Sequence, residues 1–200
     1  MELARQNIEQ HWQAWVEVVE RERSNLEQIL NSPASEQELS AAEAALGVAL
    51  SAEFHDLYRL HNGGSTSNDL FCGLSFMSLE TVIAQWQSTG RGLEDLDEDD
   101  LRSIEEELSV EPLGAIKQQY FNRAWIPFAT DGSGNFVGVD LDPGENGSRG
   151  QVINFGRDDL EMFVIAPDIA GFLATLRHLT EEGPYQRPHL LHDLWTYLYG

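Results

Sequence analysis

The side chains that could carry out a nucleophilic reaction are few in this sequence. Cys72 is the only cysteine, and it would need an activating histidine to act as a nucleophile. Its position in an apolar run is more typical of a small buried strand residue. Ser133 stands between Gly132 and Gly134, a spacing that differs from that of a nucleophile elbow. The sequence therefore predicts no catalytic residues.

A metal-dependent hydrolase is the enzyme class for which the histidines could provide ligands. His189 and His192 stand three residues apart with Asp193 beside the second, so they could share one face of a helix. No other residue completes a convincing ligand set. We therefore expect these histidines to be solvated or to cap a helix, without a metal.

An acidic stretch contains part of the pattern of a calcium loop. Asp95, Asp97 and Asp99 have the spacing of the first loop ligands, and Glu106 stands at the twelfth position. Asp100 occupies the sixth position, where the loop needs glycine for its turn. Glycine-rich phosphate-binding motifs are absent from the sequence as well. The sequence therefore predicts neither a metal nor a cofactor.

Composition limits the classes of partner. The chain has 200 residues, and its 34 acidic and 12 basic residues give a net charge of −22. Nucleic acids and anionic membranes bind basic surfaces, so the charge argues against both as main partners. It favours a cationic protein partner, or high solubility alone. The single cysteine, the polar N-terminus and the lack of any run near the roughly 18 apolar residues of a membrane span predict a cytoplasmic protein.

The acidic stretch is the strongest candidate for a binding surface. Residues 94–111 contain ten acidic residues and one arginine, a net charge of −9, and we interpret residues 93–111 as a partly helical insertion. Clustered carboxylates speed encounter with a basic protein and select partners by sign. A solvated face that only aids solubility is the alternative. The candidate partner-binding residues are Trp86, Leu93, Asp95, Asp97, Glu98, Asp99, Asp100, Glu105 and Glu106.

Helices are predicted throughout the first part of the chain. Residues 1–32 have the apolar spacing of one long amphipathic helix. Ser35 and Glu38 form a capping box at the start of a second helix, and Gly47 is a typical residue for its end. Ser51 is positioned to cap a third helix.

The later part of the chain changes to short strands separated by turns. A helix is expected from Ser78, another after Pro167, and a third over residues 190–198. Helices before strands, without regular alternation, indicate an α+β fold with a single antiparallel sheet and helices around it. The predicted strands cover residues 70–77, 125–129, 136–141, 151–155 and 162–165.

Three segments in order carry a recognisable pattern. Residues 39–64 contain Glu43, Leu46 and Gly47 in a Glu-x-x-Leu-Gly stretch, followed by a helix and by Asn62-Gly63. Residues 125–155 contain Trp-Ile-Pro, the Asp131-Gly132 turn, Asp140 and Gly150-Gln151-Val152-Ile153, and residues 167–176 read as a closing helix. Together they resemble the SUKH superfamily, named for the yeast cell-wall assembly regulator and its bacterial relatives. Ser51 stands where the family usually has proline, and serine can also cap a helix.

The resemblance implies a SUKH-like α+β domain over residues 33–180 and no catalytic residues. Many bacterial members resemble immunity proteins that bind toxins, often nucleases, whereas the yeast relative regulates signalling and the cell wall. Our leading hypothesis is an immunity protein that neutralises a basic toxin domain by direct binding. The alternative is a regulatory or signalling scaffold without a toxin partner. Residues 1–32 would pack on the core or form a homodimer, and residues 181–200 form a helical extension.

Overall fold

The structure is a computed structural model, and it describes all residues except 1, 24, 66, 95, 182 and 186–188, with the side chains of residues 2–6, 93 and 94 also outside the description. The helices are α1 (Glu2–Glu22), α2 (Leu26–Ile29), α3 (Glu36–Leu46), α4 (Ala52–Leu60), α5 (Leu79–Glu94), α6 (Glu98–Glu107), α7 (Ile169–Glu181) and α8 (Leu190–Tyr199). The strands are β1 (Ser75–Phe76), β2 (Ser109–Glu111), β3 (Trp125–Thr130), β4 (Asn135–Asp140), β5 (Gln151–Gly156) and β6 (Glu161–Ala166).

One sheet forms the centre of the molecule, with the strand order β1-β3-β4-β5-β6-β2. The first five strands of that order pair antiparallel, and β2 pairs parallel with β6. The parallel pairing is possible because β2 and β6 are far apart in the chain and are joined by a long connection rather than a hairpin. The predicted α+β fold with a single sheet is therefore confirmed, and the sheet is mixed at one edge.

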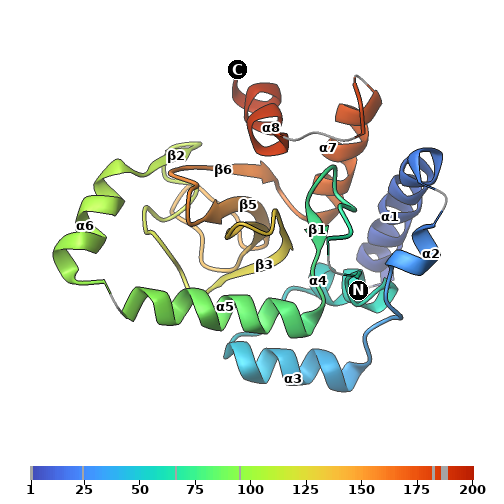
Figure 1. The fold of residues 1–200 in the computed structure, drawn as a ribbon, viewed down its shortest axis with the longest axis horizontal. Coiled ribbons are helices and arrows are strands. Elements are labelled where there is room, and N and C mark those ends of the chain that lie inside the picture. The colour runs from blue at the N-terminus through green and yellow to red at the C-terminus, as the bar shows by residue number, and fades with distance from the viewer. Residues whose placement is uncertain (1, 24, 66, 95, 182, 186–188) are drawn as a thin grey trace.

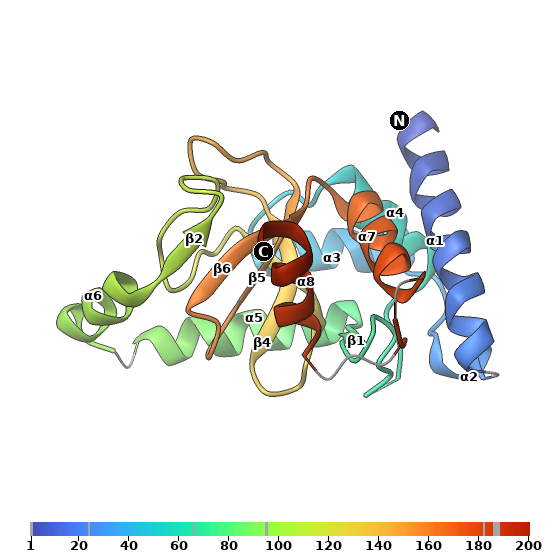
Figure 2. The ribbon, with the colours of Figure 1, turned by 90° about the horizontal axis from the view of Figure 1, so that it is seen from above.

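Helices cover the sheet from several sides (Figures 1 and 2). α5 packs against β3, α7 against β5 and β6, and α8 against β6. Because they are covered on both faces, β3, β4 and β5 are buried at nearly every position. α1, α4 and α7 gather at one end of the molecule, and α6 lies at the opposite end.

The long helix predicted over residues 1–32 is interrupted after α1. Arg23 turns away from a helical path and donates a hydrogen bond to the carbonyl oxygen of Asn68, and it lies 3.4 Å from the carboxylate of Asp69. The short helix α2 then buries Leu26 and Ile29 separately. Contacts with a distant loop therefore override a helical spacing that is continuous in the sequence.

The predicted apolar face of α1 packs on the body of the molecule. Ile8, Trp15 and Val19 are completely buried, and α1 lies against α4 and α7. Burying these large side chains stabilises the helix in this position by roughly 1.5–3 kcal/mol for each aliphatic residue. The domain boundaries at residues 32 and 180 and a homodimer through the N-terminal helix stay predictions.

The strand predicted over residues 70–77 is reduced to the two residues of β1. Cys72 has a φ of +56° and Gly73 a φ of +110°, so the chain turns sharply there instead of extending. Phe71 and Leu74 exchange backbone hydrogen bonds of 2.9 and 3.1 Å across this turn. The apolar run therefore forms a buried tight turn followed by a short edge strand.

The predicted helix caps are confirmed. The hydroxyl of Ser35 accepts a hydrogen bond from the N–H of Glu38 at 3.2 Å, and the Glu38 carboxylate accepts one from the N–H of Ser35 at 2.8 Å. Gly47 ends α3 in the left-handed conformation with a φ of +70°, and the hydroxyl of Ser51 caps α4. Local chemistry alone fixes these helix ends.

Candidate functional site

The candidate site is the part of the acidic stretch that we call the acidic arm, residues 96–107, which comprises α6 and the two residues before it. Asp97 is the N-cap of α6, and its carboxylate accepts hydrogen bonds from the N–H groups of Asp99 and Asp100, both at 2.9 Å. Acidic residues in a first helical turn also interact favourably with the helix dipole. The predicted helical insertion is therefore confirmed for α6, and its acidic residues help to form the helix.

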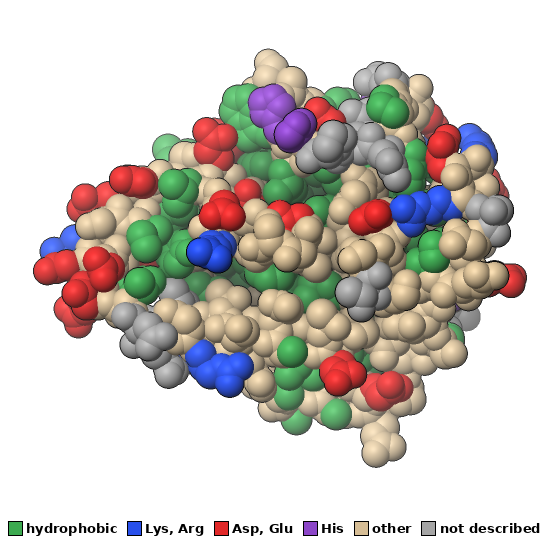
Figure 3. Space-filling model, viewed as in Figure 1, with side chains coloured by type: hydrophobic (Ala, Val, Ile, Leu, Met, Phe, Trp, Pro, Cys, Tyr) green, Lys and Arg blue, Asp and Glu red, His purple; other side chains and the backbone are tan. Residues whose placement is uncertain are grey.

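The outward face of the acidic arm consists of carboxylates in water. α6 contains no buried residue, and Glu98, Asp99, Asp100 and Glu106 are exposed. Within the described part of the arm, one ion pair joins Asp99 to Arg102 at 3.8 Å, between two strongly exposed side chains. Such pairs contribute little to stability. Among the described residues, the outward face of the arm is therefore a mainly negative surface (Figure 3), with Asp99 paired to Arg102.

Glu105 is an exception among the predicted binding residues, because it faces the body of the molecule. Its carboxylate accepts a hydrogen bond from the N–H of Tyr120 at 3.2 Å. The side chain of Gln118 donates to the carbonyl oxygens of Glu105 and Leu108, both at 3.0 Å. These contacts attach the end of α6 to the body, so Glu105 is a positioning residue.

Trp86 is also placed differently from the expectation of a surface anchor. Its side chain is 7% exposed, and its indole N–H donates a hydrogen bond to the carbonyl oxygen of Arg123 at 3.1 Å. The guanidinium of Arg123 lies 5.5 Å from the ring centroid. Because Arg123 covers this ring, Trp86 presents little apolar surface to a partner. Asp95 and the side chain of Leu93 lie outside the described residues.

A hollow of about 540 Å³ lies beside the acidic arm. α5, the chain around Tyr120 and the adjoining ends of β4 and β5 enclose it, and Leu96 of the arm lines one side. Hydrophobic side chains are visible in the hollow, next to the acidic side chains over α6 (Figure 3). Sequence reasoning missed this hollow, because Phe136 and Phe155 come from separate strands and each reads as an ordinary core residue.

The side chains considered for catalysis or metal binding do not form a site. Cys72 is buried, and His189 and His192 are exposed on or beside α8. Among the described residues, no group of three or more His, Cys, Asp or Glu side chains is arranged to hold a metal ion. Asp97 caps a helix and Asp99 lies within it, so the partial calcium-loop pattern does not form a loop.

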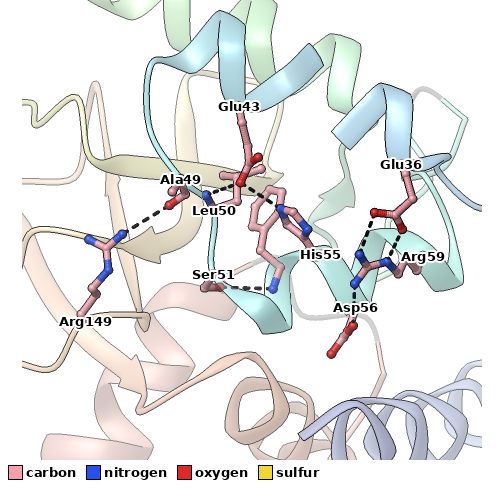
Figure 4. A network of polar contacts seen from close by, with 10 residues as sticks. Glu36, Glu43, Ala49, Leu50, Ser51, His55, Asp56, Arg59 and Arg149 are labelled. Atoms are coloured by element: carbon pink, nitrogen blue, oxygen red, sulfur yellow. Dashed lines mark hydrogen bonds and ion pairs between the residues drawn. The ribbon is translucent and has the colours of Figure 1, made fainter. Parts of the chain in front are cut away.

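Unlike the exposed carboxylates of the acidic arm, the acidic residues Glu36, Glu43 and Asp56 of α3 and α4 take part in a network of polar contacts (Figure 4). The carboxylate of Glu43 accepts a hydrogen bond from the N–H of Leu50 at 2.9 Å and lies 3.1 Å from the Nε2 atom of His55. The guanidinium of Arg59 contacts Glu36 at 2.6 Å and Asp56 at 3.0 Å. These contacts hold the α3–α4 connection in place, so Glu43 of the recognised pattern has a structural role.

Comparison with known proteins identifies the family. The model of the SMI1 / KNR4 family (SUKH-1) matches residues 33–175, which is most of the chain. This chain belongs to the SMI1/KNR4 family. The sequence-based assignment to the SUKH superfamily is therefore confirmed.

The similar curated proteins are fungal. The chain is 28% identical to "Cell wall assembly regulator SMI1" of Saccharomyces cerevisiae, over 88% of this chain and 40% of that protein. It is 27% identical to a "KNR4/SMI1 homolog" of Yarrowia lipolytica, over 82% of this chain and 29% of that protein. It is 28% identical to "Cell wall biosynthesis/cell cycle regulator smi1" of Schizosaccharomyces pombe, over 74% of this chain and 31% of that protein.

These relatives bear on the two functional hypotheses for this SMI1/KNR4 member. The chain spans less than half the length of each of the three relatives. Two of them are named as regulators, which favours the regulatory alternative over the leading immunity hypothesis. The immunity, toxin-neutralisation and bacterial assignments gain no support from them. Among the described residues, no helix is both long and apolar enough to cross a membrane.

Proposed function

We propose that this chain is a non-catalytic regulatory module of the cell-wall regulator type that binds a basic protein partner through its acidic arm. The observation that carries the proposal is the exposure of the arm. Glu98, Asp99, Asp100 and Glu106 are exposed on a helix that buries no residue, whereas Glu43 and Glu36 of α3 bind a backbone N–H group and an arginine. The names of the relatives, two of which are regulators, support the regulatory part of the proposal.

The acidic arm has the physical properties of an electrostatic docking surface. The arm is negatively charged and belongs to a chain whose total net charge is −22, so it attracts cationic proteins and repels polyanions. Both ends of α6 are held, at the Asp97 cap and at the Glu105–Tyr120 hydrogen bond, so binding a partner would not require ordering the helix. A preorganised surface loses less conformational entropy on binding.

Zero-length cross-linking in the native cell tests this proposal. A carbodiimide joins a carboxylate to an amine, and Lys117 is the only lysine of this chain, so few cross-links can form within it. Lys117 also lies in an ion pair with Asp142 at 2.6 Å. We expect mass spectrometry to find partner lysines joined to Glu98, Asp99, Asp100 or Glu106.

Exposed acidic residues at the other end of the molecule provide the control. Glu17, Glu20 and Glu27 of α1 and α2 should form no comparable cross-links to the partner. A cross-linked protein of cell-wall synthesis or signalling supports the regulatory function. A toxin domain as the cross-linked partner, or equal cross-linking at the control residues, overturns it.

A further inference from the structure

The hollow beside the acidic arm has a floor of aromatic rings. Phe136 and Phe155 are 4% and 3% exposed, and their ring centroids are 5.8 Å apart. Both rings line the hollow, together with Phe121, which is only partly buried. The volume of about 540 Å³ is in the range of pockets that enclose a small ligand or a few side chains. The floor therefore suits a large apolar side chain.

The acidic arm forms one rim of this hollow. Leu96, immediately before the helix cap Asp97, lines the hollow at the start of the arm. At the other end, the hydrogen bond between the N–H of Tyr120 and the carboxylate of Glu105 joins α6 to a second lining residue. The negative surface and the apolar floor are therefore held next to each other, and one bound segment could contact both.

The opposite wall supplies a hydrogen-bond donor. Arg157, at the end of β5, lines the hollow and is exposed, and its guanidinium forms no ion pair with the described residues. A guanidinium in this position can donate hydrogen bonds to backbone carbonyl oxygens of an extended segment. Arg157 is thus the charged residue among those that line the hollow, and the carboxylates of the acidic arm lie at its rim, beyond Leu96 and Tyr120.

We infer that the hollow binds an extended segment of a protein partner in which a large apolar side chain is flanked by lysine or arginine. This inference rests on the proposed function, because it assigns the partner's chemistry at the same surface. The apolar side chain enters the aromatic floor, the cationic side chains face Glu98 and Asp99, and Arg157 donates to the segment's backbone. Charge complementarity decides the choice of occupant, since the rim belongs to the most acidic stretch of a chain of charge −22.

Fluorescence anisotropy with a labelled peptide tests the inference. The probe is acetyl-Gly-Arg-Lys-Leu-Phe-Lys-Arg-Gly-amide, measured at low salt, where screening is weak. One control peptide has Ser-Ser in place of Leu-Phe, and a second has glutamate in place of every lysine and arginine. We expect saturable binding of the probe, binding weaker by about tenfold or more for the Ser-Ser peptide, and none for the glutamate peptide.

Two protein variants locate the binding site. Gly92 lines the hollow, and a Cβ atom added there meets nothing within 4 Å, so Gly92→Trp should fill the hollow without disturbing the fold. Gln87→Trp puts the same side chain at an exposed position of α5 that does not line the hollow. Gly92→Trp should weaken probe binding by about tenfold, and Gln87→Trp by less than about twofold. Denaturant unfolding confirms that both variants are folded.

The outcomes separate this inference from the proposed function. Absence of saturable probe binding, equal binding of the Ser-Ser peptide, or equal loss in both tryptophan variants overturns the inference about the hollow. The cross-linking experiment does not use the probe peptide. If the inference about the hollow fails but partner lysines are cross-linked to α6, the proposed function is still supported. If the cross-links are absent as well, both fail.

Discussion

The α3–α4 region and the acidic arm both use many carboxylates, but they use them in opposite ways. In residues 36–64, which we call the signature unit, Glu43 binds a backbone N–H and His55, and Arg59 is held between Glu36 and Asp56. In the acidic arm, Glu98, Asp99, Asp100 and Glu106 are exposed, and of these four Asp99 alone forms an ion pair with a described residue. The same residue types thus stabilise the fold in one region and charge the surface in the other.

The difference shows that a carboxylate contributes to stability when a donor lies within hydrogen-bond reach and is shielded from water. The N–H of Leu50 is such a donor, because leaving it unpaired and partly buried costs free energy. The outward face of α6 offers few donors of this kind, so its charges act mainly at a distance. Substitutions in the two regions should therefore have different effects on stability and binding.

Gly63→Ala should have the largest effect on stability. Gly63 has a φ of +68°, and an added Cβ atom would lie 2.3 Å from the backbone nitrogen of Ser78. We expect a loss of about 3 kcal/mol or more in the free energy of unfolding, from backbone strain and the clash. Gly92→Ala, next to the acidic arm, should instead increase stability by roughly 0.5–1 kcal/mol, because alanine favours a helix. Urea unfolding measures both, and a similar loss for the two variants would contradict the comparison.

Glu43→Ala should have the second largest effect. The substitution leaves the N–H of Leu50 without its acceptor and removes the partner of His55, so we expect a loss of roughly 1–3 kcal/mol. The matched change in the arm is Glu106→Ala, which should alter stability by less than about 0.5 kcal/mol. Equal losses in chemical denaturation would show that Glu106 also has an intramolecular partner.

Asp159→Asn examines a third case, a carboxylate that is mostly buried without a good partner. Its Oδ2 atom is buried and accepts no hydrogen bond from the described residues. The pKa of Asp159 is raised from 3.8 to about 6, mainly by burial; the Asn154 amide offsets part of the increase, and the nearby carboxylates of Asp131 and Asp158 add to it. The Nδ2 atom of Asn154 donates its well-formed hydrogen bond to the carbonyl oxygen of Glu161 at 2.9 Å.

The sign of the pH dependence follows from the raised pKa. Between pH 3.8 and about 6 the folded state keeps the Asp159 proton that the unfolded state releases, so the wild-type protein loses stability as the pH rises through this range. Asp159→Asn should therefore be more stable than wild type at pH 8, by roughly 1–3 kcal/mol, and the gain should vanish below about pH 4. Asp158→Asn on the same turn, where the side chain is exposed, should show a much smaller gain. A gain independent of pH would rule out this explanation.

Neutralising the acidic arm should change stability least. The variant combines Glu98→Gln, Asp99→Asn and Asp100→Asn. It weakens the favourable interaction with the helix dipole but also reduces the repulsion between neighbouring carboxylates, so the free energy of unfolding should change by less than about 0.5 kcal/mol. Association with the cationic probe peptide should nevertheless slow and depend less on salt. The combined control is Glu17→Gln, Glu20→Gln, Glu27→Gln, at the far end of the molecule. If both sets slow stopped-flow association equally, only the net charge matters and the arm is not a docking surface.

The sequence predicted the features that depend on a few neighbouring residues. The Ser35–Glu38 capping box, the Ser51 cap and the left-handed Gly47 need only side chains and backbone groups within one helical turn. The interruption after α1 was missed because it depends on contacts of Arg23 with residues more than forty positions away in the chain. The shortness of β1 was missed because it depends on a buried turn at Cys72. Trp86 was named as a candidate for partner binding, and the sequence did not reveal that Arg123 covers its ring.

The sequence by itself determined the net charge, the family and the position of the acidic stretch, because these depend on composition and on the order of residues along the chain. The tertiary structure alone decided which carboxylates remain available to a partner. Glu105 faces Tyr120 while Glu106 faces water, although the two are adjacent in an acidic run. The physical reason is that hydrogen-bond donors and apolar walls from distant segments reach only some positions, and the aromatic hollow beside the arm is assembled from such segments.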